Sequence, residues 1–405
     1  MNQILKEDPS LEANLNSYLI CLLPVGLLAG SLVSNIIVVL ICIVFLIEII
    51  QKNKIYLIKD KNFYFLIFIY LYVVFNALLV AQNEDSIIKA IGFIRFIILT
   101  YAIFYCFSFF KKRIIKFWSI IFFIVSIDIL IEFYFGQNLL GFSAAYYGRI
   151  ASFTGDELKI GGFYFGFIFL CLSFFFKDNK KLFIFLASIF FIISLIIGER
   201  SNFLKIFIMY MIFYFFYLKI SNLKKFLYIV SIFIVSLLII NNIPIIKSKY
   251  YNQIFNEFIK AKKGNYDLDL EKLVKGNQHL GHYKVALLMF KEKPIFGHGF
   301  KTYRNESFKE KYTNNKIKVG STHPHQIHFE ILSELGIVGY ILIMSNLLYL
   351  IFRKSKSDDE LYIFGKIFIL ASLVPILPSG SFFTSYGTTI FFINYSFLLK
   401  SYNLK

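Results

Sequence analysis

The sequence predicts an all-α, polytopic helical membrane protein with about 12 membrane-spanning helices and one large external loop that is partly helical. Of its 405 residues, 58% are hydrophobic and only 17% are charged, whereas an average soluble domain is roughly 25% charged. Apolar runs of about 20 residues, the length that crosses a bilayer, follow one another along the chain. This composition excludes a soluble globular enzyme, a disordered chain and a secreted disulfide scaffold.

The expected spans, in chain order, are 17–30, 32–50, 62–80, 91–110, 114–135, 160–176, 181–197, 202–218, 223–240, 329–352, 362–377 and 383–400. Only Gly30 and Ser31 interrupt the first two runs, so these two pieces can also form one bent hairpin. No basic region with a cleavage site precedes the first run, so we expect no cleavable signal. All four cysteines lie inside apolar runs, without the spacing of a metal site or a disulfide framework.

Lysine and arginine residues indicate the orientation of the chain. The short loops and termini on one side of the expected spans carry 20 of them, and those on the other side carry 4. The more basic side is expected to be cytoplasmic, which places both termini inside the cell. The chain then divides into a bundle of about nine spans (1–240), a large external loop (241–328) and three further spans (329–405). Because the basic residues are spread over short loops, the net charge of +18 does not indicate a nucleic-acid site.

Ionisable residues inside spans are costly, and they are usually paired or functional. Arg95 lies near the outer end of the fourth span, and Asp128 and Glu132 lie one helical turn apart near the outer end of the fifth. If these two spans form a hairpin, Arg95 can pair with either carboxylate. We therefore predict a structural ion pair here.

Arg200 lies in a turn of only a few residues between two expected spans, on the external side. Its guanidinium is a planar fork of donors that suits a phosphate group. Two simpler interpretations stay open, an anchor to lipid headgroups and an ion pair with Glu199.

The segment around the start of the tenth span contains three histidines within six residues, His323, His325 and His328. Pro324 suits the first turn of a helix, which Thr322 or His323 can cap. His325 would then lie at the positive end of a helix, where anions bind. The alternatives are a metal site, for which no cysteine is available, and solvated histidines at the membrane surface.

The external segment contains an amphipathic stretch near 249–263 and a second expected helix at about 282–293, which Pro294 would end. It also contains Asp267-Leu268-Asp269, a D-x-D match of the kind that holds metal-bound nucleotide sugars. Three residues are too short a motif to assign that chemistry, so we interpret them as loop.

Three blocks of the sequence resemble the O-antigen ligase and O-antigen polymerase superfamily, which are membrane glycosyltransferases of the C-type fold. The first is GERS at 198–201, similar to the family's S-R turn. The second is GHY at 281–283 followed by KPIFGHGF at 293–300, similar to its P-x-x-G-x-G loop. The third runs from HPHQ at 323–326 into ELGIVG at 334–339, similar to its H-N-x-x-L…E-x-G-x-x-G signature. The likeness covers about 185–345.

The resemblance implies a donor glycan on a polyprenyl diphosphate at the outer face of a bacterial inner membrane. It implies Arg200 as the group that binds the diphosphate and His325 as the catalytic base, without a metal or another cofactor. Gln326 stands where the family usually has asparagine, and His282 stands where it often has arginine, so Arg304 or Arg149 would supply the second cation. The residues expected to bind substrate are His282, Arg304, Arg149, His323, Gln326 and His328.

Four functions remain open at this stage. A ligase transfers the glycan to a lipid A–core sugar, and a polymerase transfers it to another lipid-linked repeat. A protein-acceptor transferase would share the donor site. A transporter or flippase of lipid-linked glycans is less consistent with the sequence, because transporters tend to show internal repeats and this chain shows none.

Overall fold

The computed structural model describes residues 8–143, 146–155, 159–176, 179–218, 220–252, 262–263, 267–268, 277–312, 320–353 and 359–399. The regular structure in these ranges is helical, apart from two antiparallel strands of two residues each, in which Lys262 pairs with Leu268. The predicted all-α class is therefore confirmed. Asp269 and most of the predicted stretch 249–263 lie outside the described residues.

The elements follow one another in two groups. The first comprises α1 (Leu11–Ala29), α2 (Ser31–Gln51), η2 (Ile55–Ile58), α3 (Lys61–Asn76), η3 (Ala77–Ala81), α4 (Glu84–Gly92), α5 (Ile94–Phe135), η4 (Ser152–Thr154), α6 (Ile160–Phe176), α7 (Lys180–Ile196), α8 (Arg200–Ile212), η5 (Phe213–Tyr217) and α9 (Asn222–Asn242). The second comprises α10 (Pro244–Lys247), η6 (Ser248–Asn252), β1 (Lys262–Lys263), β2 (Asp267–Leu268), α13 (Gln278–Glu292), α14 (Tyr303–Glu306), α15 (Ile327–Phe352), α16 (Glu360–Ser372) and α17 (Ser385–Leu399).

Six helical segments of the described residues are long and apolar enough to cross a membrane: Leu11–Ala29, Ser31–Gln51, Lys61–Ala81, Glu84–Phe135, Asn222–Asn242 and Ile327–Phe352. The apolar helix α6 is shorter, with 17 residues. Several other expected spans also form shorter helices, such as α16 with 13 residues. Membrane-spanning helices are thus supported by length and composition, whereas the count of 12 stays a prediction.

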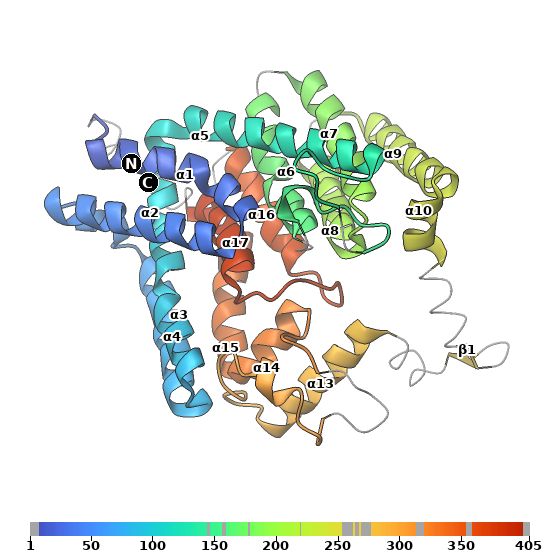
Figure 1. Cartoon of the computed structure of the whole chain (residues 1–405). Helices are drawn as coiled ribbons and strands as arrows, with labels where there is room; N and C mark the ends of the chain where they lie inside the picture. Colours follow the sequence, from blue (N-terminus) through green and yellow to red (C-terminus); the bar gives the residue numbers. More distant parts are fainter. Residues whose placement is uncertain are drawn as a thin grey trace.

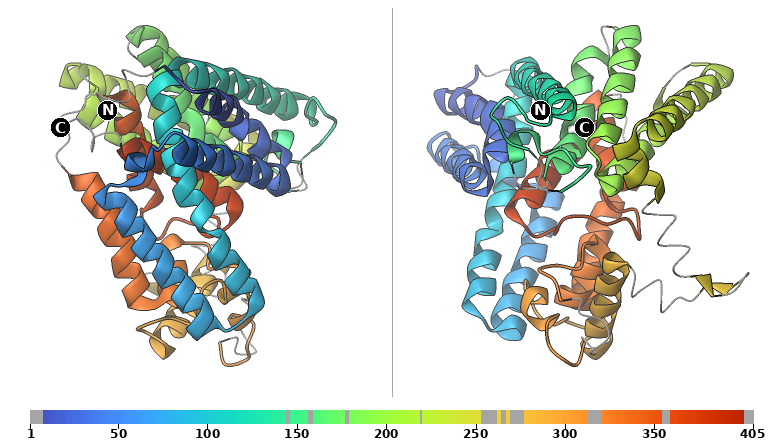
Figure 2. Two further views of the ribbon diagram at one scale, coloured as in Figure 1. Left: turned by 90° about the vertical axis from the view of Figure 1, so that its left-hand side faces the viewer. Right: turned by 45° about the vertical axis from the view of Figure 1, so that its right-hand side comes forward.

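The hairpin expected at 111–116 is instead a kinked continuous helix. α5 runs for 42 residues with non-helical backbone angles only at Phe110, and its two halves point in clearly different directions (Figures 1 and 2). The basic residues of the expected loop have found partners on other helices. Arg113 donates to the side chains of Asn14 (2.6 Å) and Ser17 (2.9 Å) on α1. These contacts allow the basic run to stay helical.

The helices form two packed groups that meet at the centre of the molecule (Figure 1). α3 packs against α4, the first half of α5 and α15, and α13 packs against α15. α6, α7, α8, α16 and α17 form the other group. The core is aromatic, with Trp118 of α5 fully buried, 5.4 Å from the Phe167 ring, and donating to the Ile20 carbonyl oxygen at 2.9 Å. Figure 1 shows α13 and α14 at one end of α15, below α8 and α17.

Candidate functional site

The loop after α13 packs tightly against a kink inside α15, and glycines on both sides of this contact hold α13 against α15. Gly297, after α13, has φ +70°, and Gly336, inside α15, has φ +66°. A Cβ atom on Gly297 would lie 2.4 Å from the Glu334 carbonyl oxygen, and one on Gly336 would lie 2.2 Å from the Ile295 carbonyl oxygen. The Gly299 amide donates to that same Glu334 oxygen at 2.9 Å. These motif glycines are therefore structural, because only glycine permits so close a backbone approach.

Two buried carboxylates of α15 hold the neighbouring loops. Glu334 accepts hydrogen bonds from the backbone amides of Lys301 (3.0 Å) and Tyr303 (3.3 Å). Glu330, one turn earlier, accepts a hydrogen bond from the Phe382 amide at 2.7 Å. The Lys301 ammonium also lies 3.6 Å from the Glu330 carboxylate. α15 thus positions both the segment that follows α13 and the segment that precedes α17.

The helix that carries the histidine motif begins later than expected. α15 begins at Ile327, and the side-chain oxygen of Gln326 caps it by accepting from two backbone amides of the first turn, at 2.7 and 3.1 Å. Pro324 therefore lies before the helix, and neither Thr322 nor His323 caps it. The Thr322 hydroxyl lies instead 3.0 Å from Nδ1 of His323. Because its oxygen is used in the cap, Gln326 positions the helix.

His325 lies just before α15 in a left-handed backbone conformation, with φ +57°. This conformation is uncommon for a residue other than glycine. The His325 carbonyl oxygen accepts a hydrogen bond from the Ser379 amide at 2.7 Å, and its Nε2 lies 3.4 Å from the Ser321 hydroxyl. Strained backbone of this kind persists where the surroundings fix it, and it clusters at functional sites. The backbone hydrogen bond to Ser379 thus fixes the position of His325, whereas its ring makes only a long contact with the Ser321 hydroxyl.

Four histidine rings form what we call the histidine cluster. The rings of His279 and His282, both on α13, each have their centroid 5.2 Å from that of His325, and the His323 ring lies 3.9 Å away. Nε2 of His323 and Nδ1 of His279 are buried without a hydrogen-bond partner among the described residues. The sequence singled out three of these histidines and missed His279.

Burial and mutual proximity lower the pKa values of three histidines of the cluster, His279, His323 and His325. Burial, followed by the charges of His323 and His279, lowers the pKa of His325 to about 3. Burial, followed by the charges of His282, Arg200 and Arg149, lowers the pKa of His279 to about 4. A neutral imidazole has one nitrogen that can accept a proton, as a general base requires.

His328 does not belong to this cluster. Its Nε2 donates to the Leu373 carbonyl oxygen at 2.8 Å, and its Nδ1 accepts from the Tyr340 hydroxyl at 3.1 Å. Both ring nitrogens therefore join α15 to the end of α16, which is a packing role. Within the described ranges, no group of three or more His, Cys, Asp or Glu side chains is arranged to hold a metal ion.

Arg200 begins α8 directly after a turn that packs closely against the loop containing Arg149. Gly198 in this turn has φ +77°, and a Cβ atom there would lie 2.1 Å from the Gly148 carbonyl oxygen. The charges of Arg200 and Arg149 both act on His279. Both arginines therefore lie within electrostatic range of His279, although the chain separates Arg200 from His325 by 125 positions.

Glu199, the alternative partner of Arg200, has other contacts. Its carboxylate accepts hydrogen bonds from the Gly161 amide (3.2 Å) and from the Asn202 side chain (2.6 Å). Glu199 is buried, and these two hydrogen bonds join the start of α8 to the start of α6.

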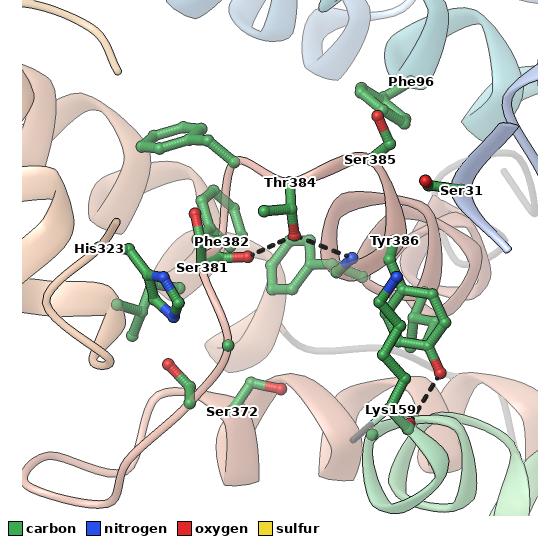
Figure 3. Close-up of a pocket in the computed structure, with 18 of the residues that line it drawn as sticks. Ser31, Phe96, Lys159, His323, Ser372, Ser381, Phe382, Thr384, Ser385 and Tyr386 are labelled. Carbon is green, nitrogen blue, oxygen red and sulfur yellow. Dashed lines mark hydrogen bonds between the residues drawn. The ribbon is translucent and has the colours of Figure 1, made fainter. Parts of the chain in front are cut away.

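A cavity of about 850 Å³ adjoins the histidine cluster at His323. Figure 3 shows its wall around the segment from Ser381 to Tyr386, where the Thr384 side chain accepts from the Gly387 amide and the Tyr386 hydroxyl donates to the Lys159 carbonyl oxygen. No aspartate or glutamate is among the lining residues. The fully charged side chains that line it are all cationic: Lys89, Arg95, Lys159, Lys205, Lys301 and Arg304.

Arg95 lines this cavity, and the structure does not bring it together with Asp128 or Glu132. Its Nη2 donates to the Ser385 hydroxyl at 3.2 Å and its Nη1 to a carbonyl oxygen of α4. Asp128 accepts from the Ser152 hydroxyl (2.6 Å), and Glu132 accepts from the amide that precedes Ser152 (3.0 Å). Arg95 does not pair with them because α5 does not reverse, and the continuing helix carries Asp128 about 27 Å and Glu132 about 33 Å past the kink at Phe110.

The sequence analysis missed Lys205, Lys159 and Lys301, all of which line the cavity. Lys205 could have been recognised from the sequence, because it is a charged residue inside an apolar run, as Arg95 is. Lys159 and Lys301 gave no such signal, since each lies in a polar segment and reaches the cavity only through the tertiary fold.

The fold and site define a helical membrane protein with a cationic cavity beside a cluster of partly buried histidines. Residues 182–344 match a family model described as O-antigen ligase, and this segment contains all three motif blocks. The resemblance to the O-antigen ligase superfamily is thereby confirmed for this part of the chain. Together with the apolar helices, the match suggests a bacterial membrane protein with a segment similar to the O-antigen ligase family. No curated protein matches the chain.

Proposed function

We propose that this protein is an O-antigen ligase-like glycosyltransferase. It moves a glycan from a polyprenyl diphosphate to a lipid A–core acceptor at the outer face of the bacterial inner membrane. The observation that carries the proposal is the histidine cluster, whose four residues lie with Arg200 in the segment that matches the ligase family, and on which the charges of Arg200 and Arg149 both act. The cationic cavity that begins at His323 supports an anionic substrate.

The reaction breaks the bond between the sugar and the lipid diphosphate. The leaving group is a diphosphate ester, so most of the catalysis consists of stabilising the negative charge that develops on it. Arg200, at the N-terminus of α8, presents its guanidinium where the helix also favours negative charge. Arg149, from the adjoining loop, is the second cation, in place of the arginine that the family often has where His282 stands.

His325 removes the proton from the acceptor hydroxyl. In the free protein its imidazole is neutral, so a nitrogen is open to that proton. A bound diphosphate would raise the pKa of His325, because a nearby negative charge favours the protonated form. Binding of the donor would therefore bring the pKa of His325 closer to the range that suits a general base. A positioned base typically contributes about 10²–10⁴-fold in rate.

A lipopolysaccharide gel of a deletion strain tests this function against its main alternative. Loss of a ligase leaves bare core, while lipid-linked polymer accumulates. Loss of a repeat-unit polymerase of the same superfamily leaves core that carries a single repeat. We expect bare core, and we expect His325→Asn and Arg200→Lys proteins, present in the membrane at normal amounts, to fail to restore the ladder. A single-repeat band would replace the ligase proposal with the polymerase.

A further inference from the structure

The end of α16, the start of α17 and the segment between them bring a row of hydroxyl groups to the cavity. The lining residues with a hydroxyl in this part of the chain are Ser372, Ser379, Ser381, Thr384, Ser385 and Tyr386. We call these residues the hydroxyl wall, and Figure 3 shows most of them around one space.

The hydroxyl wall lies beside the proposed catalytic base. The Ser379 amide donates to the His325 carbonyl oxygen at 2.7 Å. The Phe382 amide donates to the buried Glu330 carboxylate of α15, also at 2.7 Å. His323 of the histidine cluster lines the same cavity. A molecule held by the hydroxyl wall would therefore lie next to the cluster.

Two polar atoms of the cavity lining have no partner inside the part of the protein that the structure describes. They are the hydroxyl oxygen of Ser379 and the side-chain oxygen of Asn35 on α2, and both atoms are buried. A buried polar atom without a partner is rare and costs free energy. A ligand with hydroxyl groups would supply the missing hydrogen bonds, since both atoms can accept and the serine can also donate.

Aromatic rings make up much of the remaining lining. They include Phe93, Phe96, Phe300, Phe382, Phe383 and Tyr386. A sugar ring carries hydroxyl groups around its rim and C–H groups on its two faces, so it matches a pocket that combines apolar rings with a few hydrogen-bonding groups. A hydrocarbon chain would leave the hydroxyl wall unused, and a phosphate ion would leave the rings unused.

The charged groups of the lining are compatible with a neutral sugar. Lys89 forms an ion pair with Asp85, and the guanidinium of Arg304 lies 3.9 Å from the same carboxylate. Lys301 lies 3.6 Å from Glu330. Carboxylates thus offset much of the charge of these three cations.

The diphosphate of the donor would occupy a different space from the sugar. Arg200 and Arg149 do not line the cavity, although their charges act on His279. The two arginines therefore act on the histidine cluster from outside the cavity, whereas the hydroxyl wall lies inside it. This division suits a reaction in which a diphosphate leaves on one side while a sugar is held on the other.

We propose that the hydroxyl wall and Asn35 bind a sugar ring beside the bond that reacts. This inference rests on the proposed function, because it names the part of the site that recognises carbohydrate. The ring belongs either to the lipid A–core acceptor or to the glycan of the donor. Both present the same chemistry, hydroxyl groups around a ring with apolar faces.

The test is saturation-transfer NMR of two oligosaccharides with the purified full-length protein in detergent. The first is dephosphorylated core oligosaccharide from the lipopolysaccharide of the source bacterium. The second is the glycan that mild acid releases from the polyprenyl diphosphate lipids of the same bacterium. Neither probe carries a lipid chain or a diphosphate, so titrations report sugar recognition alone.

The variants are Ser379→Ala and Asn35→Ala, which remove the two polar atoms that lack a partner. Ser236→Ala is the matched control, because Ser236 is also a buried polar residue, in the apolar helix α9, but does not line the cavity. Loss of one neutral hydrogen bond typically changes affinity about two- to tenfold.

We expect Ser379→Ala and Asn35→Ala to weaken binding of the same oligosaccharide by about that factor, and Ser236→Ala to bind like wild type. Ser379→Ala should unfold at the wild-type temperature, because its hydroxyl has no partner to lose among the described residues. Loss for the core oligosaccharide identifies the acceptor, and loss for the released glycan identifies the donor. Wild-type affinity in both variants, or no binding by the wild-type protein, would overturn the sugar site.

Failure of this inference is distinguishable from failure of the proposed function. If both variants bind the oligosaccharides normally while the Arg200 and His325 variants still abolish the ladder on the gel, the sugar site is wrong and the transferase stands. If sugar binding depends on Ser379 but the deletion strain makes a normal ladder, the sugar site stands and the ligase function is wrong.

Discussion

Replacement of Gly336 by alanine should unfold the protein much more readily than replacement of an unconstrained glycine. The left-handed conformation alone costs an alanine about 1–2 kcal/mol. At Gly336 the new Cβ atom would also lie 2.2 Å from the Ile295 carbonyl oxygen, a backbone atom that cannot rotate away. Forcing such an overlap typically costs a further 1–3 kcal/mol or so. We therefore expect Gly336→Ala to lower the free energy of unfolding by about 2–5 kcal/mol.

Gly141→Ala is the matched control. Gly141 has φ +80°, but a Cβ atom there would meet nothing within 4 Å. It therefore carries the conformational cost of about 1–2 kcal/mol without the overlap. The difference between the two variants isolates the contact between the loop after α13 and the kink in α15.

A thiol-reactive dye in detergent can follow this unfolding, because Cys21, Cys42, Cys106 and Cys171 are all buried and free in the folded protein. The dye signal should appear at a clearly lower temperature for Gly336→Ala than for Gly141→Ala, and at a slightly lower temperature for Gly141→Ala than for wild type. Equal shifts for the two variants would refute the tight packing of this loop against the kink in α15.

Four further predictions follow from the site and the topology. Arg95→Ala should leave the amount of membrane-inserted protein normal but reduce transfer on a lipopolysaccharide gel, whereas Glu132→Ala, which leaves buried backbone amides without an acceptor, should cost about 1–3 kcal/mol and lower protein abundance on an immunoblot. The pKa values of His279 and His325, about 4 and about 3, lie below the ordinary 6.5, so the unfolded state binds more protons below pH 6.5. Their contribution to stability should be complete above pH 6.5 and fall steadily towards pH 3, and His325→Asn should flatten this dependence in thermal unfolding. Chelating agents should not change the transfer rate of the purified protein, and a rate that falls on chelation and returns with a divalent metal would contradict metal-independent chemistry. A reporter active only in the cytoplasm, fused near position 265, should be silent, and activity there would reverse the topology.

Local patterns were enough to predict the helical segments and the break between the first two. Gly30, with φ +117°, separates α1 from α2 where the sequence placed the break. The reversal after the fourth span was predicted from the basic run at 111–116, and this prediction was wrong. A basic run stays helical when other helices supply its partners, as α1 does for Arg113, and such partners are not visible along the chain.

The site was partly predictable for a similar reason. Arg200 and the histidines stood out because polar groups at the ends of apolar runs are unusual. The roles of Gln326 and His328 could not be derived from composition or spacing, since the first depends on where α15 begins and the second on contact with Leu373. The error over Arg95 followed directly from the wrong reversal in α5. Contacts between distant segments, rather than local sequence, determine which of these polar residues face the cavity.

The most direct test of the central claim is glycan transfer by the purified protein from a polyprenyl diphosphate-linked donor to lipid A–core in detergent. Three proteins should be compared at equal folded amounts: wild type, Arg200→Lys and His325→Asn. We predict transfer by wild type and a loss of about 10²–10⁴-fold for His325→Asn. We also predict a large loss for Arg200→Lys, which keeps the charge but not the two-pronged contact. Transfer at the wild-type rate by both variants would contradict the claim that Arg200 and His325 act on one donor.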